Sequence, residues 1–360
     1  MRELSVAELR KAAKQGDPEA QFGLGVCYSS GEGVRQDNTK AAKWFLRAAR
    51  QGHADAQFRL GLCYANGNGV KKNHTEAIQW YRKAAEQGCI DAQFNLALYY
   101  ASGRGIPQDY AQAALWYRKA AEQGCRNAQF NLALYYANGR GIPQDYAQAA
   151  LWYRKAAEQG DADAQFNLAL LYDDGTGVEQ DEAEAARWFR KAAKQGDPKA
   201  QFNFAVCCAN GTGVTQDYAK ALRWYRRAAR QGAPDAECNL GVCYADGRGV
   251  KKDYRKAMKW FRKAARQGDA IAQFNLATGY YRGEGVEQDC AEAVKWFLKA
   301  AEQGDADAQF HLGLCYENGS GVKPDPVEAI QWYRKAAQQD HADARARLER
   351  YNRESGSPEK

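Results

Sequence analysis

Residues 128–163 read AQFNLALYYANGRGIPQDYAQAALWYRKAAEQGDAD, and the same pattern of small, aromatic and glycine residues recurs every 36 residues along the chain. The period begins at Ala20 and runs to Asp343 without insertion or deletion, which gives nine repeats. A fixed period of this length is typical of solenoids, in which each repeat packs only on its neighbours. The period excludes most enzyme folds, because these cannot be tiled in this way.

Each repeat is predicted to form two helices joined by a Gly-x-Gly turn. The first helix follows a glycine and in several repeats begins at an aspartate such as Asp161, a preferred N-cap residue. The second helix begins at Asp145 in this repeat, and all nine repeats have Asp or Asn at that place. The predicted hairpins make the fold class all-α.

The second helix is amphipathic. Its apolar residues Ala149, Trp152, Tyr153, Ala156 and Ala157 follow the i, i+3, i+4, i+7, i+8 spacing of one helix face. All nine tryptophans of the chain fall at the repeat position of Trp152. The alanines allow neighbouring helices to approach closely, and we expect the tryptophans to fill the space between layers.

The N-terminal end is modified to close the solenoid. Residues 1–19 are expected to form a capping half-repeat with a single helix. Ser5 and Glu8 have the spacing of a capping box, and Leu4 with Leu9 has that of a hydrophobic staple. Such a helix covers the first face of the repeat array.

The remaining boundaries follow from the period. Residues 20–343 are the nine tandem repeats, and residues 344–351 start a further repeat that becomes charged. A polar outer face suits a C-terminal capping helix. Residues 352–360 have no apolar pattern and are expected to be a disordered tail.

The repeat resembles a known family. The matching residues of one repeat are Ala128-Gln129-Phe130-Asn131-Leu132-Ala133, Tyr136, Gly139, Gly141-Ile142, Asp145, Ala149, Trp152-Tyr153, Lys155-Ala156-Ala157 and Gly160. They are similar to the Sel-one-like repeat (SLR), a relative of the tetratricopeptide repeat, over about nine-tenths of the chain. The resemblance implies a right-handed α/α superhelical solenoid whose first helices line a concave face. It also implies a scaffold or adaptor that binds protein segments there, and it identifies no partner.

A row of asparagines is the candidate binding site. One position of the first helix is Asn in six successive repeats, namely Asn95, Asn131, Asn167, Asn203, Asn239 and Asn275. Arg59 and His311 occupy this position next to the two ends of the row. An Asn amide is both donor and acceptor, and the related tetratricopeptide repeats imply that it clamps an extended peptide. The alternative is that each amide bonds to the neighbouring hairpin within the solenoid.

No catalytic constellation emerges, so the chain is expected not to be an enzyme. The alternative is a hydrolase similar to β-lactamase-labelled relatives of the repeat family. An S-x-x-K motif runs from Ser320 to Lys323 in an ordinary Gly-x-Gly turn, and neither S-D-N nor K-T-G accompanies it.

The cysteines and histidines do not form a metal site or a disulfide framework. Five of the ten cysteines recur at one repeat position, whereas a stapled hairpin needs two recurring positions. The four histidines are far apart in the sequence. We therefore expect free thiols, a cytoplasmic location, and neither metal nor cofactor.

Charge and hydropathy limit the partners. The net charge of +7 permits acidic partners but does not require nucleic acid, which is not expected as a partner. No apolar run is long enough to span a membrane, and the N-terminus lacks a secretory signal. Basic pairs such as Arg118-Lys119 recur on the second helix, either as a solvated face with ion pairs to residues such as Glu122 or as a ridge for an acidic partner. A monomer is favoured.

Overall fold

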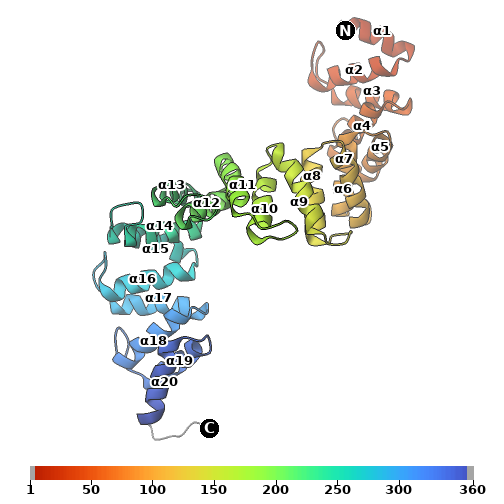
Figure 1. The fold of residues 1–360 in the computed structure, drawn as a ribbon. Helices are drawn as coiled ribbons and strands as arrows, with labels where there is room; N and C mark the ends of the chain where they lie inside the picture. Colours follow the sequence, from red (N-terminus) through yellow and green to blue (C-terminus); the bar gives the residue numbers. More distant parts are fainter. Residues whose placement is uncertain (1–4, 355–360) are drawn as a thin grey trace. The chain divides into compact units, whose positions relative to one another are not determined.

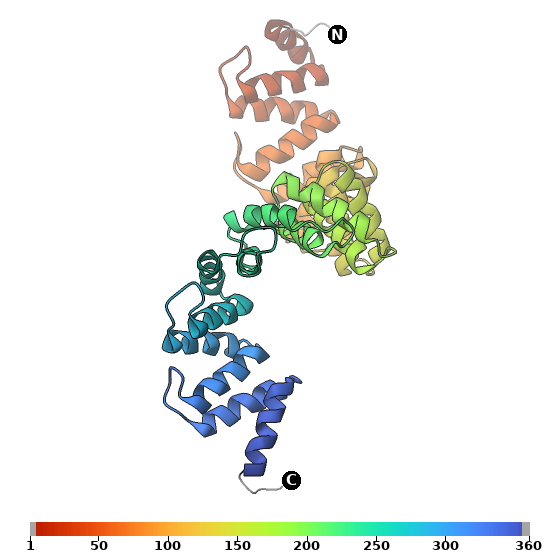
Figure 2. The same ribbon diagram turned by 60° about the vertical axis from the view of Figure 1, so that its left-hand side comes forward.

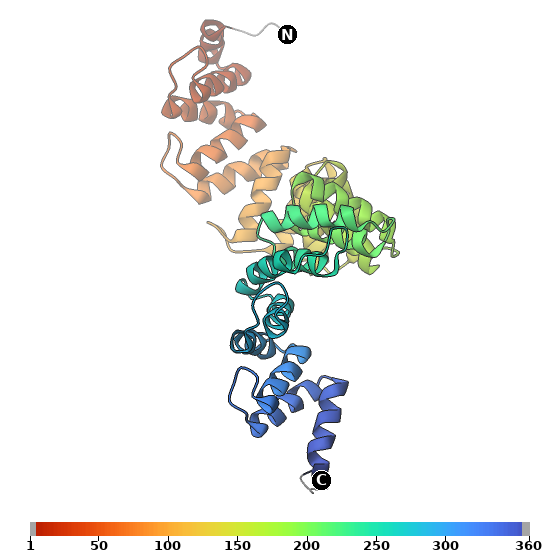
Figure 3. The same ribbon diagram turned by 90° about the vertical axis from the view of Figure 1, so that its left-hand side faces the viewer.

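The computed structural model describes residues 5–354, which form twenty α-helices with no strand among them. This confirms the predicted all-α solenoid. The chain divides into an N-terminal half that ends at Gln180 and a C-terminal half that begins at Asp181. Within each half, every helix packs against the helices that precede and follow it in the chain (Figure 1, Figure 2 and Figure 3).

The helices alternate between the two types predicted for each repeat. The N-terminal half contains α1 (Val6–Gln15), α2 (Pro18–Ser30), α3 (Asn38–Arg50), α4 (Ala54–Asn66), α5 (His74–Glu86), α6 (Ile90–Ser102), α7 (Tyr110–Glu122), α8 (Arg126–Asn138), α9 (Tyr146–Glu158) and α10 (Ala162–Asp174). The C-terminal half contains α11 (Glu182–Gln195), α12 (Pro198–Asn210), α13 (Tyr218–Arg230), α14 (Pro234–Asp246), α15 (Tyr254–Arg266), α16 (Ala270–Arg282), α17 (Cys290–Glu302), α18 (Ala306–Asn318), α19 (Pro326–Ala337) and α20 (Ala342–Glu354). The even-numbered helices from α2 to α18 are the first helices of the repeats, and the odd-numbered helices from α3 to α19 are the second helices.

The helices start at the residues that the sequence predicts. Every second helix has its Asp or Asn N-cap, and each cap side chain accepts a backbone N–H of the first turn. Asp145, for example, accepts from the Gln148 N–H at 2.9 Å. Asp161 caps the first helix α10 in the same way, accepting from Ala164 at 2.9 Å. These bonds satisfy backbone donors that a helix cannot pair internally.

The deepest ring in the core is the aromatic residue that follows each tryptophan. Tyr153 is 2% exposed, and Phe297 and Tyr333 are fully buried, whereas Trp152 retains 7% exposure. Four tryptophans are buried, namely Trp116, Trp152, Trp188 and Trp332, and the other five are partly exposed. The Trp thus lies at the edge of the space between layers, and its neighbour occupies the centre.

The Gly-x-Gly turn closes against the preceding repeat. Gly141 has φ 71°, and a Cβ atom there would lie 2.3 Å from the backbone carbonyl carbon of Tyr110 at the start of α7. No side chain fits at such a distance, so the second glycine allows the turn to touch the preceding second helix. This accounts for the invariance of the glycine in structural terms.

Buried glutamines join successive hairpins. Gln129 on α8 is 4% exposed, and its Nε2 donates to the carbonyl oxygen of Ala121 on α7 at 3.1 Å. Its Oε1 accepts from Nε2 of Gln159, which follows α9, at 2.7 Å. Corresponding glutamine pairs occur in other repeats of both halves. In these repeats the hairpin is therefore linked to the one before it by a satisfied buried polar chain.

The first helix of the chain, α1, begins as predicted. Ser5 and Glu8 form the expected capping box at the start of α1, with the Ser5 N–H donating to Glu8 Oε2 at 2.8 Å. The expected staple involves Leu4, which lies outside the described residues.

The C-terminal helix is longer than expected. The predicted cap, residues 344–351, is part of α20, which runs from Ala342 to Glu354. Residues 352–354, assigned to the disordered tail, are therefore helical, because the charged helix continues past Tyr351. The rest of that expected tail, residues 355–360, lies outside the described residues.

Candidate functional site

The asparagines of the predicted row lie half-buried on the first helices α6, α8 and α10 of the N-terminal half and α12, α14 and α16 of the C-terminal half. In each, Nδ2 donates to the carbonyl oxygen four residues earlier in the same helix, over 2.8–3.0 Å. The bond therefore runs within the helix and not to the neighbouring hairpin. This bond uses one of the two N–H groups of Nδ2 and fixes the orientation of the carboxamide. The second N–H group and the carboxamide oxygen take no part in the bond.

The residues predicted at the ends of the row differ from one another. Arg59 on α4 is exposed. His311 on α18 is half-buried, its Nδ1 lies 2.8 Å from the carbonyl oxygen of Asp307, and its ring stacks on Phe297. His311 thus reproduces the asparagine geometry, and Arg59 does not. In each half, we call the surface that carries its asparagines and its end residue, Arg59 or His311, the asparagine face.

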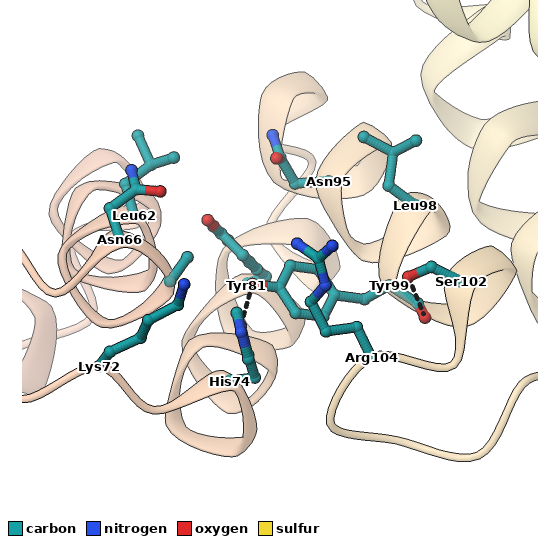
Figure 4. A pocket seen from close by; sticks show the side chains of 11 residues that line it. Leu62, Asn66, Lys72, His74, Tyr81, Asn95, Leu98, Tyr99, Ser102 and Arg104 are labelled. Atoms are coloured by element: carbon teal, nitrogen blue, oxygen red, sulfur yellow. Dashed lines mark hydrogen bonds between the residues drawn. The ribbon is translucent and has the colours of Figure 1, made fainter.

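A pocket opens on the asparagine face of the N-terminal half, between α4 and α6 (Figure 4). Its volume is about 260 Å³. The residues that line it are Leu62, Ala65, Asn66, Lys72, His74, Tyr81, Asn95, Leu98, Tyr99, Ser102 and Arg104. Asn95, the first asparagine of the row, therefore lines this open pocket.

Aromatic groups form the floor of this pocket. The Tyr99 hydroxyl and His74 Nδ1 are hydrogen-bonded at 2.9 Å, and the Tyr81 and Tyr99 ring centroids are 5.7 Å apart. Lys72 and Arg104 flank His74 in Figure 4. Burial, followed by the charges of Lys72 and Arg104, lowers the pKa of His74 below its usual value. His74 is therefore neutral at neutral pH, and the positive charge comes from the lysine and the arginine.

The C-terminal half has a pocket at the same repeat positions. It has a volume of about 350 Å³ and is lined by Val242, Ala245, Asp246, Tyr254, Met258, Phe261, Asn275, Thr278, Gly279, Arg282 and Glu284. Gly279 takes the place of Tyr99, and a Cβ atom there would meet Met258 Sδ at 2.2 Å. Met258 therefore fills the space of the missing ring. The two pockets share an asparagine but differ in charge.

Sequence reasoning identified the asparagines but missed the charged and aromatic side chains that line the pockets. The signal was the position of His74, at the start of the second helix, which is Tyr in four repeats and His in only one. The charge at the position of Arg104 also varies between repeats. Sequence variation at these two positions does not by itself predict a cavity, because the cavity forms only when α4, α5 and α6 pack together.

The repeats identify the family. The Sel1 repeat matches nine consecutive segments, namely residues 18–53, 54–89, 90–125, 126–161, 162–197, 198–232, 234–269, 270–305 and 306–341. The chain belongs to the Sel1 repeat family. Sel1 repeat proteins are generally protein-interaction scaffolds and typically not enzymes.

Solved structures support this assignment. A protective antigen of uropathogenic Escherichia coli strains with an SLR fold is 36% identical, with 99% of this chain and 85% of that chain covered and a TM-score of 0.81. A Sel1 repeat protein from Oxalobacter formigenes is also 36% identical, with 86% of this chain and 89% of that chain covered and a TM-score of 0.68. No curated protein sequence matches this chain. The Sel1 relatives therefore establish the fold and leave the partner open.

The basic residues on the second helices of this Sel1 repeat protein have intramolecular contacts. A Lys or Arg three residues after each tryptophan lies over its ring. Lys155 Nζ, for example, is 4.0 Å from the ring centroid of Trp152. Arg118 donates to the Tyr136 hydroxyl of the next repeat at 2.6 Å. No ion pair from Arg118 to Glu122 is found among residues 5–354, where the guanidinium bonds to the tyrosine hydroxyl. These contacts make the basic ridge the weaker candidate for binding a partner.

The cysteines of the Sel1 repeats are packing residues. All ten lie within the described residues, and no disulfide joins any of them. Burial raises the pKa of Cys63 to about 11 and that of Cys315 to about 12, so these thiols remain protonated at neutral pH. No group of acidic, Cys or His side chains that could hold a metal occurs in residues 5–354. The helices within the same range are too short or too polar to cross a membrane.

The S-x-x-K motif lies in the turn between α18 and α19. The Ser320 N–H donates to the carbonyl oxygen of Cys315 at 3.0 Å, which is a closing bond of the turn. Arg140 and Thr176 form the same bond in their own repeats. Ser320 thus holds an ordinary position of the Sel1 turn.

Proposed function

We propose that this Sel1 repeat protein is a non-catalytic scaffold that binds an extended polypeptide segment of a partner protein on the asparagine face. The observation that supports this most strongly is the orientation of the asparagines. Their Nδ2 bonds to the helix backbone hold each carboxamide in place before any ligand arrives. Fixed polar groups bind a peptide backbone with little loss of side-chain entropy.

The pockets add side-chain sites to this backbone site. Asn95 and Asn275 each line a pocket, and the two are 180 residues apart, which is five repeats. Leu62 and Leu98 contribute apolar surface in one pocket, and Val242 does so in the other. An extended segment alternates its side chains, so those that point toward the face would enter such pockets while its amides meet the asparagines.

The test compares two triple variants of the full chain. Asn95, Asn131 and Asn167, all in the N-terminal half, are changed together to Ala. The control changes Gln79, Gln112 and Gln148 to Ala, which removes three amides from second helices of the same half. Binding to an array of short random-sequence peptides is measured for both. We expect the asparagine variant to lose most of its binding and the control to retain it.

Circular dichroism distinguishes lost binding from lost structure. Should the alanine variant unfold, Ser at the same three places retains a hydrogen bond to the carbonyl four residues earlier but lacks the carboxamide. Retained binding in a folded Ser or Ala variant would show that the asparagine face is not the binding site. The basic ridge of the second helices then becomes the better candidate.

The absence of catalysis has a direct test. The pure protein is expected not to hydrolyse nitrocefin above the buffer rate. Hydrolysis that disappears in a Ser320→Ala variant would support the alternative, a β-lactamase-like hydrolase, and would contradict the scaffold as the whole function.

We also propose that the protein works as a monomer in a reducing compartment such as the cytoplasm. The unlinked cysteines support the reducing compartment. The partner is proposed to be a protein or peptide rather than a nucleic acid, because the basic second-helix residues are engaged by tryptophan rings and tyrosine hydroxyls.

A further inference from the structure

The charged side chains that line the pocket of the N-terminal half are all basic. Lys72 and Arg104 are its charged residues, and no Asp or Glu lines it. Both side chains are exposed, and neither forms an ion pair with a carboxylate in residues 5–354. Figure 4 shows them on either side of His74. The two positive charges are thus directed to a concave site and are not neutralised there.

The corresponding arginine one repeat later is engaged differently. Arg140 is the equivalent of Arg104, and its guanidinium lies 5.1 Å from the ring centroid of Tyr110. His74 replaces Tyr110 in the earlier repeat, and it bonds to the Tyr99 hydroxyl instead. No aromatic ring lies beneath Arg104 among the described residues. Arg104 therefore lacks the ring contact that Arg140 has.

The pocket of the C-terminal half has the opposite charge. Glu284 stands at the position of Arg104, and Asp246 stands at the position of Asn66. With Arg282 included, that lining carries two acids and one base, whereas the N-terminal lining carries two bases and no acid. The repeat position is thus constant while its charge is not, as expected of residues that select different ligand side chains.

We propose that the pocket formed by Lys72, His74, Asn95, Tyr99 and Arg104 binds an acidic side chain of the extended segment. This inference rests on the proposed function. The pocket lies between the first helices α4 and α6; α2 precedes these helices, and α8 and α10 follow them within the same half. A segment lying on the asparagine face therefore continues past the pocket in both directions, and the carboxylate it presents is a side chain rather than a chain terminus. Asn95 positions the peptide backbone at the rim.

The experiment uses the full chain and acetylated, amidated peptides of alternating alanine and threonine that differ only in a central Glu, Gln or Lys. Affinity is measured by fluorescence anisotropy at low ionic strength. We expect the Glu peptide to bind about fivefold more tightly than the Gln peptide, the upper end of the effect of exposed charge pairs. Added salt reduces the difference.

Variants assign the preference to the pocket. Lys72→Gln combined with Arg104→Gln is expected to abolish the preference for Glu, and Arg104→Lys is expected to retain it. Arg104→Glu introduces the residue of the C-terminal pocket and is expected to favour the Lys peptide. The matched control is Arg140→Gln, which removes an arginine from the same turn one repeat later and leaves the preference unchanged.

The outcomes separate this inference from the proposed function. Equal binding of the Glu and Gln peptides, or a preference for Glu that survives the double Gln variant, overturns the acidic pocket while the scaffold stands. A Gln peptide with a free C-terminus that matches the amidated Glu peptide shows that the pocket takes a chain terminus, which overturns the side-chain assignment. Failure of every peptide to bind overturns both proposals.

Discussion

At the scale of single residues, the buried Glu237 is the exception in the glutamine chain. It occupies the place of Gln129 and Gln201 and is 4% exposed. Gln267 Nε2 donates to its Oε2 at 2.9 Å, as the equivalent glutamines do elsewhere. A carboxylate has no N–H to donate to the preceding hairpin, whereas Gln201 donates to the carbonyl oxygen of Ala193 at 3.2 Å. The link between hairpins is therefore incomplete at this point.

Glu237→Gln is expected to stabilise the protein by about 1 kcal/mol at pH 8, because it restores a hydrogen bond. Burial raises the pKa of Glu237, so the carboxylate is disfavoured in the folded state. The folded pKa lies above the unfolded pKa, so wild-type stability falls as pH rises from the unfolded value through the folded one. The gain from the substitution should therefore shrink as pH falls toward the usual Glu pKa of about 4.3.

Urea unfolding of both proteins across this pH range measures the effect. Gln201→Glu is the reciprocal variant and should destabilise most at high pH. A gain from Glu237→Gln that does not change with pH would show that Glu237 is not the titrating group.

The tryptophan position gives a second prediction at this scale. Trp152→Ala should destabilise by about 3–5 kcal/mol, because a large buried ring leaves a cavity between helices. Trp152 is 7% exposed, and its ring centroid lies 4.0 Å from Lys155 Nζ. Trp80 is more exposed, so Trp80→Ala should cost less. Thermal melts measure both, and an unchanged melt for Trp152→Ala would contradict its assignment to the core.

At the scale of elements, the hairpins were predictable and their connections were not. The N-caps at residues such as Asp145 follow from composition and spacing alone, since a cap bonds to its own first turn. Gln129 reads as an ordinary polar residue, and its partners Ala121 and Gln159 are set by packing between hairpins. The asparagines lie on the first helices as predicted, but the bond from Asn131 to Asn127 within the helix was not foreseen. Contacts within an element are encoded locally, whereas those between elements depend on how the hairpins meet.

The turn between helices offers a matched pair of glycines. Gly141 and Gly160 have φ values of 71° and 90°. A Cβ atom at Gly141 meets the backbone of Tyr110, whereas one at Gly160 meets nothing within 4 Å. Gly160→Ala should therefore cost about 1 kcal/mol for its backbone conformation, and Gly141→Ala should cost clearly more because a backbone must also move. Equal losses of unfolding free energy in urea would show that the turn does not touch α7.

At the scale of the whole molecule, the thiols report on packing throughout the chain. Native protein treated with iodoacetamide at pH 8 should modify the partly exposed Cys27 and Cys290 before the buried Cys63 and Cys315. The pKa of Cys63 is raised to about 11 by burial, so little of its reactive thiolate is present at that pH. Mass spectrometry after unfolding in the same reagent should find no disulfide. Bridged cysteines would contradict the proposed reducing compartment.

The glutamine chain also makes the length of the molecule adjustable in fixed steps. Residues 92–127 and 128–163 differ at only four positions, and the bond from Gln129 to Ala121 recurs from Gln165 to Ala157. Removing residues 128–163 would place Gln165 against Ala121, which restores the joint one repeat earlier.

We therefore expect this deletion to yield a folded protein with a slightly lower melting temperature, whereas removal of residues 128–162 should unfold the neighbouring hairpins. Circular dichroism of the two deletions distinguishes these outcomes. The gain or loss of a whole repeat in one mutational event should thus leave a folded protein. The binding surface can therefore become longer or shorter during evolution without a misfolded intermediate.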